Sequence, residues 1–387
     1  MLKGKTGYST NANASTAGKE AAKMLKDSLE NVKVVYAYGS CNYDVDEMVG
    51  GIGEVLPGVP VIGNTSFTGV IVNQGFITGE DGFLGLMGLE DEDLVVGVAA
   101  VEKRNCAIED GEEVARKAMK NAGKDCPPDY FYMVASPGEE EYYLKGITKV
   151  IGRVPFFGGS AADNSISGDW KIYTDKGSFA DGVAVLFFYT DKKMYNKFTG
   201  SYRETEDVGI ITKLDGDRTL VEIDGKSAID VYATWRNMPA EKFDGGNLLV
   251  ETIVSPLGVK DRLGNLVAIR HPMNGNPDGS MAIGNNLAES TAVIRMEATV
   301  DELISSTDET LRELKDKMNT PGAYHLVHCG GRRAGIGDRI DEVAKRIQDE
   351  AGDVPFIVEF TFGEYGFEDD GLNTCGGLML SFTGFEK

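Results

Sequence analysis

The amino-acid sequence predicts an α/β protein in which mixed sheets are covered by helices, built from about four related β-α-β-β units in two domains. The chain has 387 residues, and 42% of them are hydrophobic, enough to fill more than one core. Short β-branched strands alternate with amphipathic helices, as in layered α/β folds. A period near 100 residues indicates a domain-scale repeat. Four prolines mark it, at intervals of 95, 101 and 99 residues: Pro60, Pro155, Pro256 and Pro355.

The first unit begins with a helix and continues as a β-α-β pattern. Ser15 and Thr16 are candidate N-caps of the helix, and Glu20 lies within range of a capping box. A β-branched and aromatic strand follows at Val32–Tyr38, and Asp44 is expected to cap the next helix. That helix and the short strand after it are expected at Val45–Val55 and Val61–Gly63.

The same pattern returns twice later in the chain. Acidic residues at Glu139–Glu141 favour a helix start, and Asp338 is expected to cap the corresponding helix of the last unit. Each copy is followed by a glycine-marked turn into an apolar strand. The predicted strands of the two copies are Tyr130–Ala135, Val154–Gly158, Tyr324–His328 and Val354–Ile357.

The middle of the chain is interpreted as a degenerate fourth copy. It contains a strand at Thr219–Ile223, a helix at Lys226–Trp235 and a strand at Leu248–Val254, directly before Pro256. A polar stretch at Thr199–Asp207 separates this copy from the strong strand that precedes it. We therefore place the domain boundary there, with domains at residues 1–200 and 201–387.

Composition excludes several classes of function. A net charge of −22 argues against nucleic acid and anionic membrane surfaces as partners, because both are polyanions. The five cysteines are scattered without a CxxC pair, which argues against disulfides and structural zinc and favours a reducing, cytoplasmic setting. The longest apolar stretch, Val183–Tyr189, has the length of a strand and is too short to span a bilayer.

Small polar residues follow several predicted strands, at the edge of the sheet where α/β proteins bind ligands. Ser40, Thr65, Ser136 and Ser160 are of this kind. Their hydroxyls and the neighbouring backbone N–H groups could hold a carboxylate or a phosphate. The alternative is that they only cap the helices that follow.

The segment from His325 to Cys329 resembles a metal site but does not predict one. Side chains alternate along a strand, so His325 and Cys329 share a face while His328 points to the other. No further ligand is evident, so we predict no metal. Cys329 is a candidate nucleophile as well, although a small buried cysteine is the simpler interpretation because no base is positioned beside it.

Two arginines and one glutamate at strand ends are candidate ligand-binding residues. Arg270 and Arg332 stand out in an acidic chain, and an arginine in a glycine-rich loop can clamp an anion. Glu364 could receive an ammonium group. The alternatives are surface ion pairs for the arginines and a solvated side chain for Glu364.

The order of several motifs resembles the FIST family (F-box and intracellular signal transduction proteins). The amino-terminal resemblance lies at Gly7–Thr10, Tyr36–Asp44, Leu56–Ser66 and Val154–Asp163. The carboxy-terminal resemblance lies at Val221–Ala228, Val267–Arg270, Cys329–Arg332 and Phe360–Glu364. Two positions depart from the family pattern: Asn64 replaces a usual small Cys or Ser, and Leu372-Asn373 stands where a His-Asn pair is usual.

This resemblance implies a sensory protein that binds a small ligand, such as an amino acid or a small carboxylate, without a cofactor. It assigns residues 1–200 to the FIST amino-terminal domain and 201–387 to the carboxy-terminal domain. Output would pass through a signalling partner or self-assembly, since the chain shows no output domain. We expect the ligand among Arg270, Cys329, Arg332, Glu364 and Asn373, or alternatively at the loop from Ser160 to Asp163. The competing hypothesis is a hydrolase or transferase that uses Cys329 or a loop serine.

Overall fold

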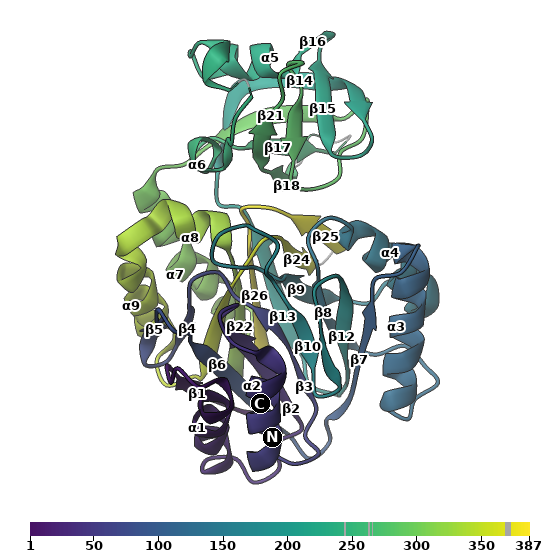
Figure 1. Ribbon diagram of the computed structural model, residues 1–387, viewed down its shortest axis with the longest axis vertical. Coiled ribbons are helices and arrows are strands. Elements are labelled where there is room, and N and C mark those ends of the chain that lie inside the picture. Colours follow the sequence, from purple (N-terminus) through teal and green to yellow (C-terminus); the bar gives the residue numbers. More distant parts are fainter. Residues whose placement is uncertain (244, 262–263, 265, 368–372) are drawn as a thin grey trace.

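A computed structural model of the chain shows a large body made of three sheets and a smaller domain at one end of it (Figure 1). The structure describes residues 1–243, 245–261, 264, 266–367 and 373–387. The mixed α/β class predicted from the sequence is confirmed. The two termini lie near each other at the end of the body opposite the smaller domain.

The body contains three repeats of one topology, in which helices separate three successive strands before a hairpin and a last strand. The first repeat comprises β1 (Lys3–Ser9), α1 (Ala14–Lys26), β2 (Val34–Gly39), α2 (Val45–Val55), β3 (Val61–Thr65), β4 (Val70–Val72), β5 (Gly75–Ile77) and β6 (Leu84–Glu90). The second comprises β7 (Val95–Glu102), α3 (Ala107–Asn121), β8 (Tyr130–Ala135), α4 (Glu140–Ile151), β9 (Phe156–Ser160), β10 (Ile172–Thr174), β11 (Gly177–Phe179) and β12 (Gly182–Tyr189). The third comprises β13 (Met194–Thr199), α7 (Val300–Asp316), β22 (Pro321–Cys329), α8 (Gly330–Ile336), α9 (Ile340–Ala351), β23 (Phe356–Thr361), β24 (Glu364–Phe367), β25 (Asn373–Gly376) and β26 (Leu380–Glu386).

The repeats are joined by exchange of their hairpins. The first sheet has the order β1-β6-β2-β3-β10-β11, the second β25-β24-β9-β8-β12-β7, and the third β13-β26-β22-β23-β4-β5. Each repeat thus gives its hairpin to the sheet of another repeat, and the three exchanges close a ring. Because both ends of the chain contribute strands to the same sheets, the body does not divide at residue 200.

The prolines that suggested the repeat occupy equivalent positions in the body. The carbonyl oxygens of Pro60, Pro155 and Pro355 each accept a hydrogen bond from the parallel neighbouring strand, at 2.9, 3.1 and 2.9 Å. Each proline directly precedes the third strand of its repeat, where its missing N–H costs no sheet hydrogen bond. Pro256 differs, since its carbonyl accepts from Met296 on an antiparallel neighbour.

The fourth predicted unit is a separate antiparallel domain, which we call the inserted domain (residues 203–297). It interrupts the third repeat between β13 and α7. Its strands are β14 (Arg203–Asp215), β15 (Thr219–Ile223), β16 (Lys226–Ser227), β17 (Leu257–Lys260), β18 (Leu266–Arg270), β19 (Pro272–Gly275), β20 (Met281–Ile283) and β21 (Ala292–Glu297). Its helical segments are α5 (Ala228–Trp235), η1 (Ala240–Lys242) and α6 (Leu249–Thr252). The strand predicted at Leu248–Val254 is therefore wrong, because that apolar segment forms α6.

Helix starts follow the capping rules with two differences from the prediction. Asp44 caps α2 as predicted, its carboxylate accepting from the backbone of Asp46 and Glu47 at 3.1 Å. Asn13, slightly earlier in the chain than predicted, caps α1 by accepting from Thr16 N at 2.9 Å. Asp338 falls in the 3-10 turn η2 (Gly337–Arg339) before α9 and makes no side-chain cap.

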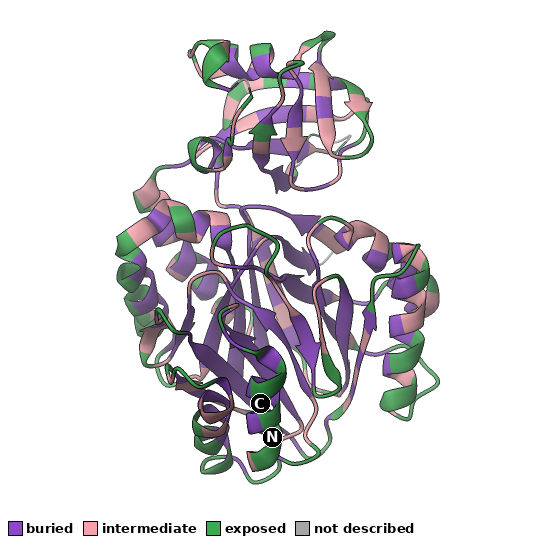
Figure 2. Cartoon of the chain, viewed as in Figure 1, coloured by how far each residue is buried: buried purple, intermediate pink, exposed green. Residues whose placement is uncertain are grey.

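The helices cover the outside of the body, and the inner faces of the sheets share one core. Figure 2 shows buried strands surrounded by helices and loops whose outer sides are exposed. Tyr36, Tyr132 and His325 lie on β2, β8 and β22, one on each repeat, and their rings meet with centroids 4.7–5.2 Å apart. The three repeats thus meet at a buried polar centre, with His325 as a core residue.

The three sheets also close a ring of backbone hydrogen bonds at the end that faces the inserted domain. Ala162 N donates to Thr65 O at 2.9 Å, Phe67 N to Phe360 O at 2.9 Å, and Phe362 N to Ser160 O at 3.2 Å. Each bond joins two different repeats. This ring fixes the loops on which the candidate site is built.

Candidate functional site

A cavity of about 280 Å³ lies between the inserted domain and the strand ends of the body; we call it the interdomain cavity. All three repeats and the inserted domain contribute to its wall. The body supplies Phe67, Pro137, Gly138, Ile166, Trp170, Cys329, Gly330, Gly331, Ala334, Phe362, Gly377 and Leu378. The inserted domain supplies Arg218, Leu249, Val250, Ile253, His271, Met273, Ile283, Gly284 and Asn285.

Aromatic rings form the body side of this wall. The Phe362 ring packs against Phe67 at 5.8 Å and edge-on against Trp170 at 6.3 Å, measured between ring centroids. The buried Trp170 Nε1 has no hydrogen-bond partner among the residues that the structure describes. Trp170 lines the cavity, and its indole N–H is a buried donor whose hydrogen-bonding capacity no described group satisfies.

Backbone strain concentrates around the cavity. Seven described non-glycine residues have a positive φ, and three lie in or next to this wall: Thr68 at 61°, Ile166 at 57° and Leu378 at 56°. For a β-branched residue such as Ile166 this conformation is rare, and strain of this kind clusters at functional sites. The strain therefore supports the cavity as the functional site.

Asp163 holds the loop that carries Ile166 and Trp170. Its carboxylate is fully buried and accepts five backbone N–H groups. The donors are Ser165, Ile166, Ser167, Gly168 and Asp169. Asp163, expected from the sequence as a ligand-binding residue, thus shapes one wall of the cavity through its loop.

Cys329 ends β22 and lies in the wall, with His271 of the inserted domain beside it. A Cβ at Gly331 would lie 3.4 Å from Cys329 Sγ and 3.5 Å from His271 Cε1. The sequence could not show this proximity, since the two residues are far apart in the chain. Burial and the nearby Glu364 carboxylate raise the pKa of the Cys329 thiol well above its usual range, and burial lowers the pKa of His271 to about 4.

We expect alkylation by iodoacetamide to distinguish Cys329 from Cys126. The thiolate is the reactive form, so the raised pKa and the burial of Cys329 should slow its modification on the order of 100-fold or more relative to the exposed Cys126. Peptide mass mapping over time measures both rates. Equal rates would contradict a protonated, buried Cys329 and favour a nucleophile.

The two arginines expected to clamp a ligand are both held by protein oxygen atoms. Arg332 is fully buried and donates to Gly200 O at 2.6 Å, Leu303 O at 3.2 Å and Ser306 Oγ at 2.6 Å. Arg270 donates to Asn286 O at 3.0 Å. Neither arginine belongs to the described wall of the cavity. Their hydrogen bonds instead connect separate segments of the chain.

The side chains of Glu364 and Asn373 also hydrogen-bond to other groups of the same chain. The Glu364 carboxyl accepts from Thr361 Oγ1 at 2.9 Å and Met379 N at 2.8 Å, and its burial raises its pKa to about 8. Asn373 donates to Val154 O at 2.8 Å, on the second repeat. Leu372, where the sequence departs from the family pattern, lies outside the described residues.

The small polar residues after the strands mainly fix loops. Ser40 Oγ accepts from the backbone of Asn42 at 3.1 Å, and Thr65 Oγ1 accepts from Lys171 N at 2.9 Å. Ser160 Oγ bonds to Tyr365 OH at 2.6 Å and donates to Glu140 Oε1 at 3.0 Å. All three serine and threonine side chains are buried, and their partners are protein groups of the neighbouring loops and strands.

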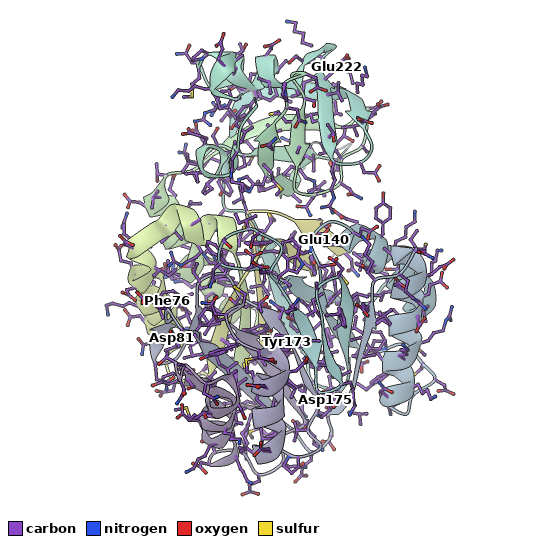
Figure 3. The ribbon with its side chains drawn as sticks, viewed as in Figure 1. Phe76, Asp81, Glu140, Tyr173, Asp175 and Glu222 are labelled. Atoms are coloured by element: carbon purple, nitrogen blue, oxygen red, sulfur yellow. The ribbon has the colours of Figure 1, made fainter. Side chains whose placement is uncertain are left out.

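Arg218 is the functional residue that sequence reasoning missed. It lies in the turn between β14 and β15 and reaches the first turn of α4, donating to Glu140 Oε2 at 2.5 Å and Glu141 Oε2 at 2.6 Å. It also donates to Gly284 O and Asn286 Oδ1. Figure 3 shows Glu140 at the end of the body that faces the inserted domain. This cluster, the Arg218 latch, joins the two parts beside the cavity.

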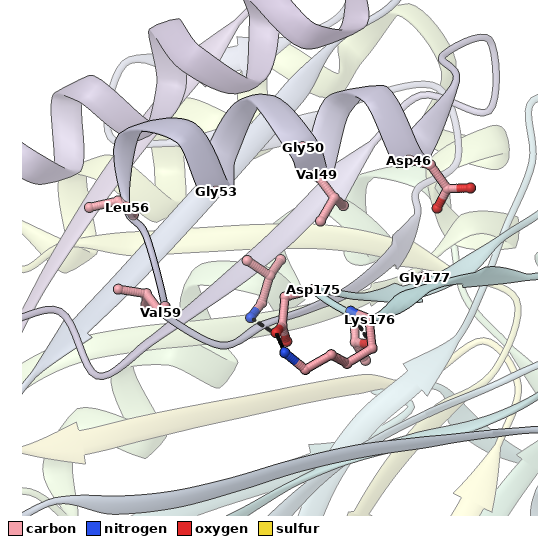
Figure 4. Close-up of a pocket in the computed structure, with 12 residues that line it drawn as sticks. Asp46, Val49, Gly50, Gly53, Leu56, Val59, Asp175, Lys176 and Gly177 are labelled. Carbon is pink, nitrogen blue, oxygen red and sulfur yellow. Dashed lines mark hydrogen bonds and ion pairs between the residues drawn. The ribbon is translucent and has the colours of Figure 1, made fainter.

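A larger and more open groove lies between α2 and the β10–β11 hairpin (Figure 4). Its volume is about 520 Å³, and Gly50, Gly53 and Val59 form part of it. The salt bridge between Lys176 and Asp175, 2.7 Å long, lies along its rim. Unlike the interdomain cavity, it shows no orphaned polar atom and no strained non-glycine residue in its described wall, so we do not assign it a function.

Two further findings concern metal sites and membrane-spanning helices. Across the described parts of the chain, no three His, Cys, Asp or Glu side chains gather in a way that could hold a metal ion. Among the described helices, none combines the length and apolar character needed to cross a membrane.

Comparison with protein families identifies the class to which this fold and site belong. Residues 33–226 match the FIST N domain, and residues 228–366 match the FIST C domain. The chain belongs to the FIST family. FIST domains are associated with sensory roles in signal transduction. No curated protein matches the chain.

Two solved structures show distant likenesses to the chain. A cyanuric acid hydrolase from A. caulinodans has 9% identity and a TM-score of 0.36, with all of both chains covered. PurLQS from Thermotoga maritima has 9% identity and a TM-score of 0.24, covering 99% of this chain and 72% of the other.

Proposed function

We propose that this FIST protein is a sensor that binds a small molecule in the interdomain cavity. The main support for this proposal is that all three repeats and the inserted domain contribute residues to the wall of the cavity. A ligand that touches both parts stabilises one arrangement of the two, because it binds that arrangement more tightly than any other. Such a change in arrangement is a signal that a partner protein can recognise. We also propose that the protein acts in the cytoplasm.

The size of the cavity suits a metabolite. At about 280 Å³ it lies just below the range of about 300–1,000 Å³ typical of ligand pockets, which suits a small molecule. An amino acid or a small carboxylate, the class expected from the sequence, would fit by size. Its carboxylate would need a cation, and Arg332 and Arg270 are engaged by protein oxygens.

A hydrolase or transferase using Cys329 is the second candidate. The observation in its favour is that His271 and Cys329 both lie next to Gly331. The electrostatics oppose it: the thiol pKa is raised, and His271 uses Nε2 in a 3.0 Å hydrogen bond to Leu249 O. A thiol that stays protonated beside Glu364 is a poor nucleophile.

Screening a metabolite panel by thermal unfolding tests the sensor proposal. A ligand present at 100 times its dissociation constant adds about 2.7 kcal/mol to the free energy of unfolding, which should raise the melting temperature by several degrees. The panel should include amino acids, small carboxylates and uncharged ring compounds.

A variant that fills the cavity connects any such shift to this site. Ala334→Trp places a large ring at an exposed position of the wall and should abolish the ligand-induced shift. Glu309→Trp, at an exposed position of α7, is the matched control and should keep it. A shift that survives Ala334→Trp would place the binding site elsewhere.

A further inference from the structure

The charge on the cavity wall is fully balanced by protein groups. Within the described wall, Arg218 is the only Lys, Arg, Asp or Glu residue. Its guanidinium faces two carboxylates, Glu140 at 2.5 Å and Glu141 at 2.6 Å, and also donates to Gly284 O at 2.6 Å and Asn286 Oδ1 at 2.7 Å. A ligand carboxylate would have to displace these acceptors, so the wall offers it no ready cation.

The other polar groups of the wall are neutral. The low pKa of His271 keeps its imidazole uncharged near neutral pH, and the raised pKa of Cys329 keeps its thiol protonated. An ionic ligand would therefore lose its hydration without gaining a counter-charge, which is strongly unfavourable.

Backbone N–H groups do not replace the missing cation. The wall contains glycine N–H groups of the kind that anion sites use, but four of them already donate to protein acceptors. Gly138 N donates to the Glu140 carboxylate, Gly284 N to His271 O, Gly331 N to Cys329 Sγ and Gly377 N to Ile269 O. The described wall thus lacks the cluster of open N–H groups that anion sites use.

The remaining features favour an apolar ring. Phe67, Phe362 and Trp170 line the body side, and aliphatic side chains of the inserted domain line the other. Two polar atoms of wall residues have unused hydrogen-bonding capacity: Trp170 Nε1 is a donor without a partner among the described residues, and His271 Nδ1 is an acceptor because Nε2 carries the proton donated to Leu249 O. Aromatic rings pack well against such walls.

We propose that the interdomain cavity takes an uncharged aromatic compound, which packs against the rings of the body and hydrogen-bonds to the Trp170 indole and the His271 imidazole. This inference rests on the proposed function, since it names the chemical class of the molecule that is sensed. It replaces the amino acid or small carboxylate expected from the sequence. A ligand that touches both Trp170 and His271 also joins the body to the inserted domain.

Three probes of nearly equal size separate charge from shape. Indole-3-carboxamide is uncharged, indole-3-carboxylate is an anion, and 3-(aminomethyl)indole is a cation near neutral pH. Calorimetric titration of the full chain should show the carboxamide binding at least about tenfold more tightly than either ion, since tenfold corresponds to only about 1.4 kcal/mol. Equal or tighter binding of the carboxylate would overturn the inference.

A tryptophan variant tests the hydrogen bond. Trp170→Phe keeps an aromatic ring but removes the N–H donor, so carboxamide affinity should fall about 2–10-fold, the usual contribution of one hydrogen bond. Trp235→Phe is the matched control, because Trp235 lies on α5 outside the described wall, and it should leave the affinity unchanged. Equal effects of the two variants would contradict the assigned donor.

The outcomes distinguish this inference from the proposed function. If indole-3-carboxylate binds best and Ala334→Trp abolishes its binding, the cavity is the sensory site and only the ligand class is wrong. If all three probes fail at millimolar concentration, the aromatic class is wrong. The proposed function fails only if no member of the metabolite panel gives a shift that depends on Ala334.

Discussion

Replacing Arg218 with methionine should lower the free energy of unfolding by about 3–5 kcal/mol, the usual cost of removing one partner from a buried ion pair. Arg218 is 22% exposed and Glu140 only 1%. Without the guanidinium, the Glu140 carboxylate would lose its counter-charge inside the protein. Burial already raises the pKa of Glu140, so the carboxyl would take up a proton, and this limits the loss.

The same variant should loosen the inserted domain. Arg218 is the ion-pairing residue through which the inserted domain reaches α4, and the Glu141 carboxylate also accepts from Asn286 N at 3.0 Å across the same interface. Urea unfolding measures the stability, and small-angle X-ray scattering measures the arrangement of the two parts. We expect a larger radius of gyration together with the lower stability.

Two further variants control the interpretation. Arg203 also contacts two glutamates, Glu297 and Glu302 at 2.9 Å, but it is 58% exposed, so Arg203→Met should change stability little. Adding Glu140→Gln to Arg218→Met should restore part of the loss, because it removes the unpaired buried charge. If the Arg218→Met chain proves as stable as the Arg203→Met chain, the latch contributes nothing.

Local patterns predicted the central β-α-β part of each repeat, but not the strand that opens each repeat or the helices α3 and α7. The proline before each third strand and the alternation of strands and helices depend on nearby residues, and the structure confirms them at Pro60, Pro155 and Pro355. The inserted domain could not be recognised in this way. A short apolar run such as Leu248–Val254 fits a strand or a buried helix equally well. The exchange of hairpins, such as β4 pairing with β23, depends on residues at opposite ends of the chain.

The candidate site was predicted only in its general position. Strand ends and their loops do form the cavity, with Cys329 in its wall. The roles of the charged residues depend on distant acceptors that no local pattern reveals: Arg332 meets the carbonyls of Gly200 and Leu303. The adjacent Glu140 and Glu141 were consistent with a nearby arginine such as Arg218. Two acidic residues at a helix start are also explained by the helix dipole, however, so the pair alone did not predict an ion pair with Arg218.

The buried centre of the body should make stability depend on pH through Glu359. This carboxyl is fully buried at the junction of the three repeats, where it accepts from Tyr132 OH at 3.2 Å and lies 3.5 Å from His325 Nε2. Tyr38 OH bonds to Tyr132 OH at 3.1 Å and to the His325 ring. Burial raises the pKa of Glu359 from 4.5 to about 8, and burial lowers the pKa of His325 to about 3, so both groups are neutral near pH 7.

The direction of the effect follows from proton binding. Between pH 4.5 and about 8 the folded chain holds a proton on Glu359 that the unfolded chain has released. Folding then takes up a proton, so the free energy of unfolding falls as pH rises, by about 1.4 kcal/mol per pH unit for this group. The stabilisation is complete below pH 4.5 and is lost as pH rises through about 8, a total on the order of 5 kcal/mol.

Glu359→Gln should remove this dependence, because the amide keeps the acceptor for Tyr132 OH and cannot ionise. The variant and the original chain should be similarly stable at pH 4.5, and the variant should be more stable by several kcal/mol above pH 8. Urea unfolding at a series of pH values measures the free energy of unfolding of both chains. The titration of His325 contributes to both chains and therefore largely cancels in the difference between them. Glu309→Gln, at an exposed position of α7, is the control and should leave the slope unchanged. Parallel pH profiles for Glu359→Gln and the original chain would show that Glu359 is already ionised in the folded protein.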